Sequence, residues 1–255
     1  MSTAHSSDRS GRLAWWYRFA PEAVALVLTL AMFAQEFTPL DGYDWLRMHV
    51  WHKAAYQHVW MSGELLHWNP FVSLGRPALA EIEAAFFYPP NLVFLLGPAA
   101  GLVVCIWLHL AWLLRGMRRL MSTMGVSGMG AWLAALTFAL GAPLLGRLQG
   151  GQIQVFCTLA WLPFLLVWGA ELARNPTARS AIKMAMATGL AVLAGSPPML
   201  WVMGWAVLGW MGSQFLSSKS RPAMGRLVGW SMLSLVGALT LSAVQVLPFL
   251  ELVQQ

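Results

Sequence analysis

Charged residues are scarce in this sequence. Only 10% of its 255 residues are Asp, Glu, Lys or Arg, whereas 58% are hydrophobic, and the mean hydropathy is +0.60. A soluble domain carries about 25% charged residues, because its surface must face water. The scarcity therefore excludes an ordinary soluble domain and indicates that much of the surface faces lipid.

Cysteine is scarce as well, and the sequence has no cleavage site for a signal peptide. The only thiols, Cys105 and Cys157, lie inside apolar runs; they form no disulfide framework, and their spacing matches no metal motif. The basic N-terminus leads into an apolar run at 23–34, but no small-residue cleavage site follows it. We therefore expect a cytoplasmic tail at 1–19 followed by an uncleaved first span.

Apolar runs long enough to cross a bilayer recur along the rest of the chain. A span needs about 20 mostly apolar residues. This criterion predicts about seven spans, at 20–38, 97–114, 129–147, 153–172, 181–197, 199–216 and 227–247. We predict an all-α, polytopic transmembrane helical bundle that forms one domain, 20–255. Because the last run is followed by no charged anchor, we also expect the chain to continue beyond it.

The basic residues indicate how the chain is oriented. The net charge of +6 accompanies no nucleic-acid-binding motif, so we predict no nucleic-acid partner. With a cytoplasmic N-terminus, twelve of the sixteen basic residues and three of the ten acidic residues lie inside, as the positive-inside rule requires. We therefore predict a cytoplasmic N-terminus in a bacterial inner membrane, with the loop 37–90 outside.

This extracytoplasmic loop holds most of the reactive side chains. It contains two of the three Asp, three of the seven Glu and four of the six His residues of the chain. Its 44–66 segment predicts an amphipathic helix at the membrane surface, broken at Ser62-Gly63. The expected apolar contacts are Leu46, Val50, Tyr56, Val59 and Trp60, and the expected polar positions are Arg47, Lys53 and Gln57.

The longest motif of the chain follows in the same loop. It reads GELLHWNPFVSLGRPALAEIEAAFFYPPN from Gly63 to Asn91, with Asp44 upstream. This arrangement resembles the first extracytoplasmic loop of the YfhO-like family of bacterial membrane proteins, whose pattern is an Asp after span one, then G-[DE]-x-P-x-W-N-P, G-x-P and F-Y-P-P. Softer similarities follow in LQGGQIQ, AWLPFLL, AGSPPML and VQVLPFLEL. The resemblance covers the chain from about Asp41 to Glu251, the N-terminal part of the longer family members.

The resemblance implies a fold and a reaction. YfhO-like proteins are similar to the GT-C class of glycosyltransferases. The implied reaction moves a sugar from a polyprenyl-phosphate donor to an extracytoplasmic acceptor, a cell-envelope polymer or lipid. The chain departs from the family pattern at Leu66, where the family has Pro. It departs again at Gln152 and Ser196, where the family often has His, and at Pro198, where it has Gln.

Asp44 is the predicted catalytic residue. The resemblance implies that it acts as general base on the acceptor. Spacing alone favours a residue that stabilises a helix N-terminus, with Asp41 as the cap. The resemblance also places Trp68, Asn69, Arg76, Tyr88 and Asp41 in the substrate site. For Trp68, Asn69 and Tyr88, a turn-fixing role remains an equal alternative.

Metal binding is weakly indicated. Glu81 and Glu83 would share a face of an extended segment and could hold a divalent cation with Asp44, although simple solvation is favoured. The loop residues His49, His52 and His58 fall on no common helical stripe.

Two further alternatives stay open. His109 lies inside the second predicted span, where a hydrogen bond to another helix is favoured over a role as metal or pigment ligand. The chain as a whole could also be a non-catalytic membrane subunit or a transporter-like scaffold that shares the fold.

Overall fold

The computed structural model describes residues 4–34, 39–63, 68–72, 74–218 and 222–254. The predicted departure at Leu66, and His67 of the loop motif, lie outside these residues. The described elements, in chain order, are α1 (Ala4–Ala34), η1 (Pro39–Asp41), η2 (Trp45–His49), α2 (Val50–Ser62), β1 (Trp68–Asn69), β2 (Arg76–Pro77), η3 (Ile82–Ala84), η4 (Pro89–Leu96), α3 (Pro98–Thr123), α4 (Gly128–Ala139), α5 (Ala142–Gln149), α6 (Ile153–Leu159), α7 (Leu162–Arg174), α8 (Ala178–Leu193), α9 (Pro197–Ser217) and α10 (Met224–Val253).

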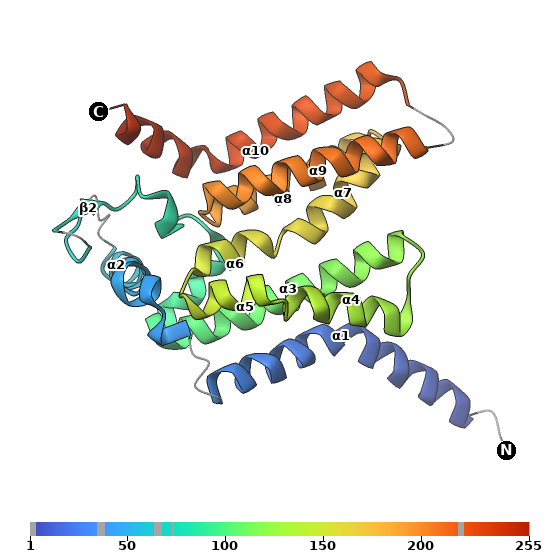
Figure 1. The fold of residues 1–255 in the computed structure, drawn as a ribbon, viewed down its shortest axis with the longest axis horizontal. Helices are drawn as coiled ribbons and strands as arrows, with labels where there is room; N and C mark the ends of the chain where they lie inside the picture. The colour runs from blue at the N-terminus through green and yellow to red at the C-terminus, as the bar shows by residue number, and fades with distance from the viewer. Residues whose placement is uncertain (1–3, 35–38, 64–67, 73, 219–221, 255) are drawn as a thin grey trace.

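The long helices lie side by side and form an all-α bundle. Helix α3 packs against α1, α4 and α7, and α8 packs against both α7 and α10. The short elements between η1 and η4 gather at one end of the bundle, which we call the loop end (Figure 1). A two-stranded antiparallel pair, β1 and β2, lies within this loop and pairs Asn69 with Arg76.

The prediction of a helical membrane protein is confirmed, but the number of spans is corrected. Within the described residues, four helical segments are long and apolar enough to cross a bilayer, or five when α4 and α5, which are bent by 40°, count as one span. The run predicted at 181–197 is the 16-residue α8, and within the part of α1 whose side chains are described the apolar stretch is Phe19–Ala34. Helix α8 ends at Leu193, because Gly195-Ser196-Pro197 interrupts its apolar run.

Proline sets where many of the helices begin. Helices η4, α3, α5, α7 and α9 all carry Pro in their first two positions, where a missing backbone N–H costs no helical hydrogen bond. Leu140-Gly141 ahead of Pro143 therefore separates α4 from α5, and Ala160-Trp161 ahead of Pro163 separates α6 from α7. The first break turns the span predicted at 129–147 into a helix pair bent by 40°, whereas α6 and α7 together still form one candidate span, Ile153–Arg174.

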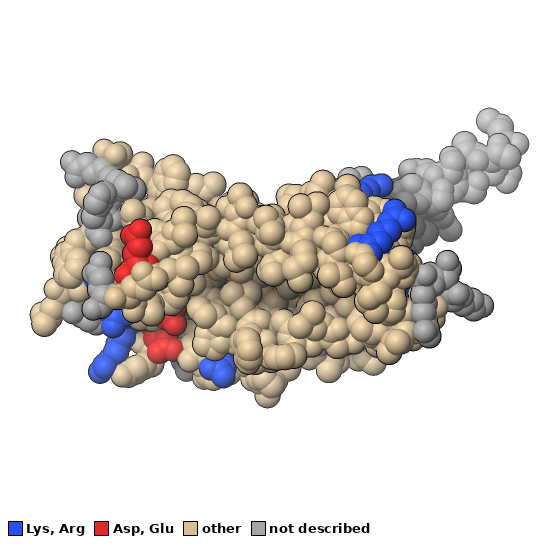
Figure 2. Space-filling model, turned by 90° about the horizontal axis from the view of Figure 1, so that it is seen from above, with Lys and Arg blue, Asp and Glu red and all other residues tan. Residues whose placement is uncertain are grey.

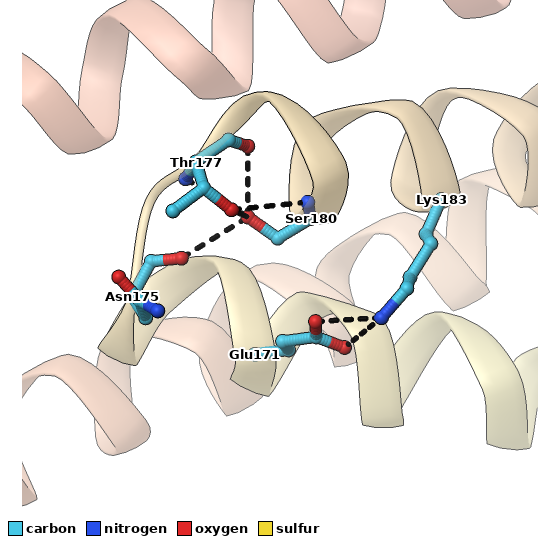
Figure 3. A network of polar contacts seen from close by, with 5 residues as sticks. All are labelled: Glu171, Asn175, Thr177, Ser180 and Lys183. Atoms are coloured by element: carbon cyan, nitrogen blue, oxygen red, sulfur yellow. Dashed lines mark hydrogen bonds and ion pairs between the residues drawn. The ribbon is translucent and has the colours of Figure 1, made fainter.

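At the end opposite the loop, α8 begins with a capping box. The Thr177 hydroxyl accepts a hydrogen bond from the Ser180 backbone, and the Ser180 hydroxyl accepts one from the Thr177 N–H (Figure 3). Nearby, Lys183 of α8 contacts both carboxylate oxygens of Glu171 on α7, at 2.6 and 2.8 Å. These contacts fix the turn between α7 and α8 at a bundle end rich in basic residues.

The outer faces of the bundle are apolar. In the most apolar 18-residue stretch of each helix, only 17% of the residues of α9 and 22% of those of α10 are buried in the protein. Figure 2 shows an uncharged band along one face, with the acidic residues of that face gathered near one end. This distribution fits a bundle surrounded by lipid, with its polar groups at the two membrane boundaries.

Candidate functional site

The loop end contains an open pocket of about 420 Å³ that we call the carboxylate pocket. Three segments that are far apart in the sequence line it. The loop contributes Asp44 and Glu83, the α5–α6 region contributes Arg147 and Gln152, and the start of α9 contributes Ser196. The complete lining is Asp44, Met48, His49, Glu83, Arg147, Gln152, Gln154, Val155, Gly195, Ser196, Pro198, Met199 and Val202.

A turn of two glycines positions Asp44. The Asp44 N–H donates to the Gly150 carbonyl at 3.1 Å. Gly151 has φ +80°, and a Cβ there would lie 2.5 Å from the backbone nitrogen of Trp45; a Cβ on Gly42 would lie equally close to Gly151. The segment before η2 therefore touches the Gly150-Gly151 turn backbone to backbone, which side chains at these positions would prevent.

A third glycine positions Glu83. Gly195, at the turn between α8 and α9, has φ +89°, and a Cβ there would lie 2.5 Å from the Ile82 carbonyl oxygen. In addition, Gln245 of α10 donates to the Leu79 carbonyl at 2.9 Å. The softer sequence similarities LQGGQIQ, AGSPPML and VQVLPFLEL thus all contribute residues that hold the loop in place.

The two carboxylates in the pocket occupy different environments. Burial raises the pKa of Glu83, and the nearby charges of Glu81 and Asp44 raise it further, against a smaller opposing effect of Arg76. Arg147 lies at the mouth of the pocket, where its guanidinium donates to the Gln152 side chain at 2.6 Å. The pocket therefore combines two carboxyl groups, of which Glu83 has a raised pKa, with one oriented cation.

The floor of the pocket is a buried polar layer formed by the helix after Asp44. The Gln154 amide lies 2.7 Å from His49 Nδ1, and burial together with the charge of Lys53 lowers the pKa of His49 to about 3. Lys53 is itself only 4% exposed and donates to the Ala84 carbonyl at 2.9 Å. Burial lowers the pKa of Lys53 to about 8. His49 is therefore neutral at pH 7.

The predicted loop helix exists, but it presents a different face to the core. Residues 45–62 form η2 and α2, as the amphipathic pattern indicated. However, Lys53, predicted as a polar surface position, is buried, whereas Leu46 and Trp60 are 52% and 55% exposed. Two features shift the buried face of this helix. The Lys53 ammonium group finds a backbone carbonyl partner, and residues 45–49 wind as a π-helix. A sequence pattern with a 3.6-residue period predicts neither feature.

The capping prediction is corrected as well. Asp44, not Asp41, occupies the position before the helix that begins at Trp45, and its carboxylate makes no capping hydrogen bond. Asp41 ends the separate short helix η1 and is exposed. The Asp44 carboxylate is therefore not engaged in capping, and it lines the carboxylate pocket instead.

The other predicted substrate residues lie away from this pocket. Asn69 is 1% exposed, and its side chain accepts from the Phe71 N–H at 3.0 Å, which fixes the turn after β1. The exposed Trp68 indole covers Gly75. Arg76 pairs with Glu81 at 3.0 Å. Among the residues predicted for the site, only Asp44 and Glu83 line the pocket.

The predicted geometry of the Glu81-Glu83 segment is wrong. Glu83 lies inside the short helix η3 and Glu81 directly precedes it, so the two do not share the face of an extended strand. A helical turn directs the two side chains apart, one to the Arg76 ion pair and the other to the pocket.

Tyr88 and His109 meet in the core behind the pocket. The Tyr88 hydroxyl lies 2.7 Å from His109 Nε2 and accepts from the Trp161 indole N–H at 2.9 Å. His109 Nδ1 lies 2.8 Å from the carbonyl oxygen of Cys105 and 3.5 Å from its Sγ. The polar partner expected for His109 therefore exists, but it comes from the loop and from its own helix.

Sequence patterns gave no signal for part of this arrangement. Cys105 and Cys157 lie on different helices, yet their sulfur atoms are 3.7 Å apart. Gln154, which forms the pocket floor with His49, was visible only as part of the motif LQGGQIQ. The chain matches no protein-family model, no curated protein and no solved structure.

Proposed function

We propose that the protein is a membrane glycosyltransferase of GT-C type that moves a sugar from a polyprenyl phosphate to an extracytoplasmic acceptor. The observation that carries the proposal is the position of Asp44, whose carboxylate lines an open pocket beside Glu83 and Arg147 at one end of the apolar bundle. A lipid-linked sugar presents its phosphate and sugar at this depth, while its tail stays in the bilayer.

The proposed step uses Asp44 as general base. Asp44 takes the proton from an acceptor hydroxyl, and the acceptor oxygen attacks the anomeric carbon. The bond from that carbon to the phosphate oxygen breaks, and the phosphate leaves with the electron pair, so the anomeric configuration inverts. Arg147, held by Gln152 at the mouth of the pocket, is suited to bind the departing phosphate, because a guanidinium matches its oxygens.

The proposed orientation follows from the charges. A cytoplasmic N-terminus places the loop end, and with it the carboxylate pocket, on the outer side of a bacterial inner membrane. There the pocket would open towards envelope acceptors.

A specific observation favours a second candidate, a non-catalytic membrane subunit or transporter-like scaffold. Gln152 and Ser196, which replace the His residues frequent in YfhO-like proteins, both line the carboxylate pocket. Neutral side chains at both positions leave no imidazole there to exchange protons.

Sugar transfer in membranes separates the two candidates. Asp44→Asn keeps the size of the side chain and removes the base, so it should lower the transfer rate by about 10²–10⁴-fold. Asp41→Asn is the matched control, because Asp41 is exposed and outside the pocket, and it should change the rate less than about threefold by the same criterion. Retained activity in Asp44→Asn would refute the catalytic role. Absence of transfer by the wild type with any polyprenyl-phosphate sugar would favour the scaffold.

A further inference from the structure

A cluster of metal-ligating side chains lies behind the carboxylate pocket and has no part in the proposed transfer. Cys105 and His109 are one turn apart on α3, so they project from the same face, and Cys157 faces them from α6. All three are at most 3% exposed. Their ligand atoms all lie within 4.8 Å of one another.

The separations between these atoms match a tetrahedral metal centre. Zinc binds cysteine sulfur at about 2.3 Å and histidine nitrogen at about 2.0–2.1 Å, so in a tetrahedron two sulfurs lie about 3.8 Å apart and a sulfur and a nitrogen about 3.6 Å apart. The sulfurs of Cys105 and Cys157 are 3.7 Å apart, and Cys105 Sγ is 3.5 Å from His109 Nδ1. A metal ion could therefore be bound with little movement of α3 against α6.

We propose that Cys105, His109 and Cys157 bind one Zn²⁺ ion, with the fourth coordination position open. Two thiolates and an imidazole suit zinc, whereas Mg²⁺ and Ca²⁺ prefer oxygen ligands. The ion replaces the two thiol protons, which leave as the metal binds. The resulting Zn²⁺ and two thiolates carry no net charge, which favours the site at this depth in the protein.

The surroundings of His109 suit a metal ligand. A ligating imidazole needs a hydrogen-bond partner for its other ring nitrogen, which fixes the ring and its tautomer. With zinc on Nδ1, the metal bond replaces the 2.8 Å hydrogen bond between Nδ1 and the Cys105 carbonyl, and the proton of His109 moves to Nε2, which lies 2.7 Å from the Tyr88 hydroxyl. That oxygen has two lone pairs, so it can accept both this bond and the one from Trp161.

A small void adjoins this cluster. Its volume is about 10 Å³, enough for about one water molecule, and its lining includes Cys157, Tyr88, His49, Gln154 and Lys53. His49 and Gln154 also line the carboxylate pocket. His49 and Gln154 therefore lie between the carboxylate pocket and the void beside Cys157.

Cobalt and zinc titrations of the purified full-length chain test the proposal. The chain is kept reduced in detergent, stripped with a chelator and titrated with Co²⁺. We expect one Co²⁺ per chain, with thiolate charge-transfer bands and the strong d–d absorption of a tetrahedral site, and displacement by one equivalent of Zn²⁺. X-ray absorption of the zinc form should show sulfur at about 2.3 Å and nitrogen at about 2.0 Å. Wild-type binding well below one equivalent, or oxygen ligands alone, would overturn the proposal.

Variants identify the ligands. Cys105→Ser, Cys157→Ser and His109→Gln should each abolish the cobalt spectrum, whereas His58→Gln, at an exposed position of α2, should keep it. Tyr88→Phe should keep the spectrum and weaken binding by about 10–100-fold. Binding that survives Cys105→Ser and Cys157→Ser together would refute the site. Because the wild-type absorption spectrum reports sulfur ligation directly, the proposal stays testable even where a cysteine variant fails to fold.

Discussion

The backbone N–H of Asp44 donates a 3.1 Å hydrogen bond to the carbonyl of Gly150, across more than 100 residues of sequence. This bond joins the start of the loop between α1 and α3 to the turn between α5 and α6. It exists only because Gly42 and Gly151 let the two backbones touch. The position of the proposed base is therefore set by a backbone contact, and the predictions below test that contact and its surroundings.

Gly151→Ala should destabilise the protein and displace Asp44. Gly151 has φ +80°, and the added Cβ would lie 2.5 Å from the Trp45 backbone. The left-handed backbone alone costs about 1–2 kcal/mol for an alanine. Gly146→Ala is the matched control, because a Cβ at this position of α5 meets nothing within 4 Å. Thermal unfolding in detergent should show a lower midpoint for Gly151→Ala only, and equal midpoints would contradict the contact.

Gly195→Ala should also destabilise the protein, and it should displace Glu83. The new Cβ would lie 2.5 Å from the Ile82 carbonyl oxygen, beside Glu83, at φ +89°. We expect a lower unfolding midpoint and, if the protein is a transferase, a lower transfer rate. Gly204→Ala within α9 is the control, since nothing lies within 4 Å of its Cβ. If Gly204→Ala loses as much stability as Gly195→Ala, the close contact of Gly195 with Ile82 does not account for the effect.

Stability should fall as the pH drops from about 6.5, because His49 is buried without its proton. A freely exposed histidine has a pKa of 6.5, whereas burial lowers the pKa of His49 to about 3 in the folded protein. Between these values the unfolded chain binds a proton that the folded chain does not, so acid favours unfolding by up to about 1.4 kcal/mol per pH unit. His49→Gln should flatten this dependence between pH 6 and 4, measured by unfolding midpoints. Identical slopes in variant and wild type would contradict a buried neutral His49.

The orientation is open to a labelling test. We expect Cys introduced at Ser62, at the end of α2, to react with an impermeant maleimide on intact cells, and Cys at Ser218, after α9, to react only after lysis. The reason is that the predicted topology puts twelve of the sixteen basic residues on the Ser218 side of the membrane and four on the other side. The native Cys105 and Cys157 are buried and should give no background. The reverse labelling pattern would invert the topology.

The sequence by itself determined the class of the protein, the helical stretch after Asp44 and many of the helix starts. Low charge and long apolar runs leave few alternatives to a helical membrane bundle, and proline marks helix starts through local backbone geometry. The span number was overestimated, since hydropathy measures composition and not whether a helix continues through a break such as Gly195-Ser196-Pro197.

Only the tertiary structure decided which side chains meet. The buried Lys53 was predicted to be exposed, because its partner, the Ala84 carbonyl, comes from a later part of the loop. The contacts of Asp44 with Gly150 and of Cys105 with Cys157 join segments whose distance depends on how α3, α5 and α6 pack. Helical periodicity specifies one face of one helix, but the site is formed by several elements in contact, and that contact depends on packing between residues distant in sequence.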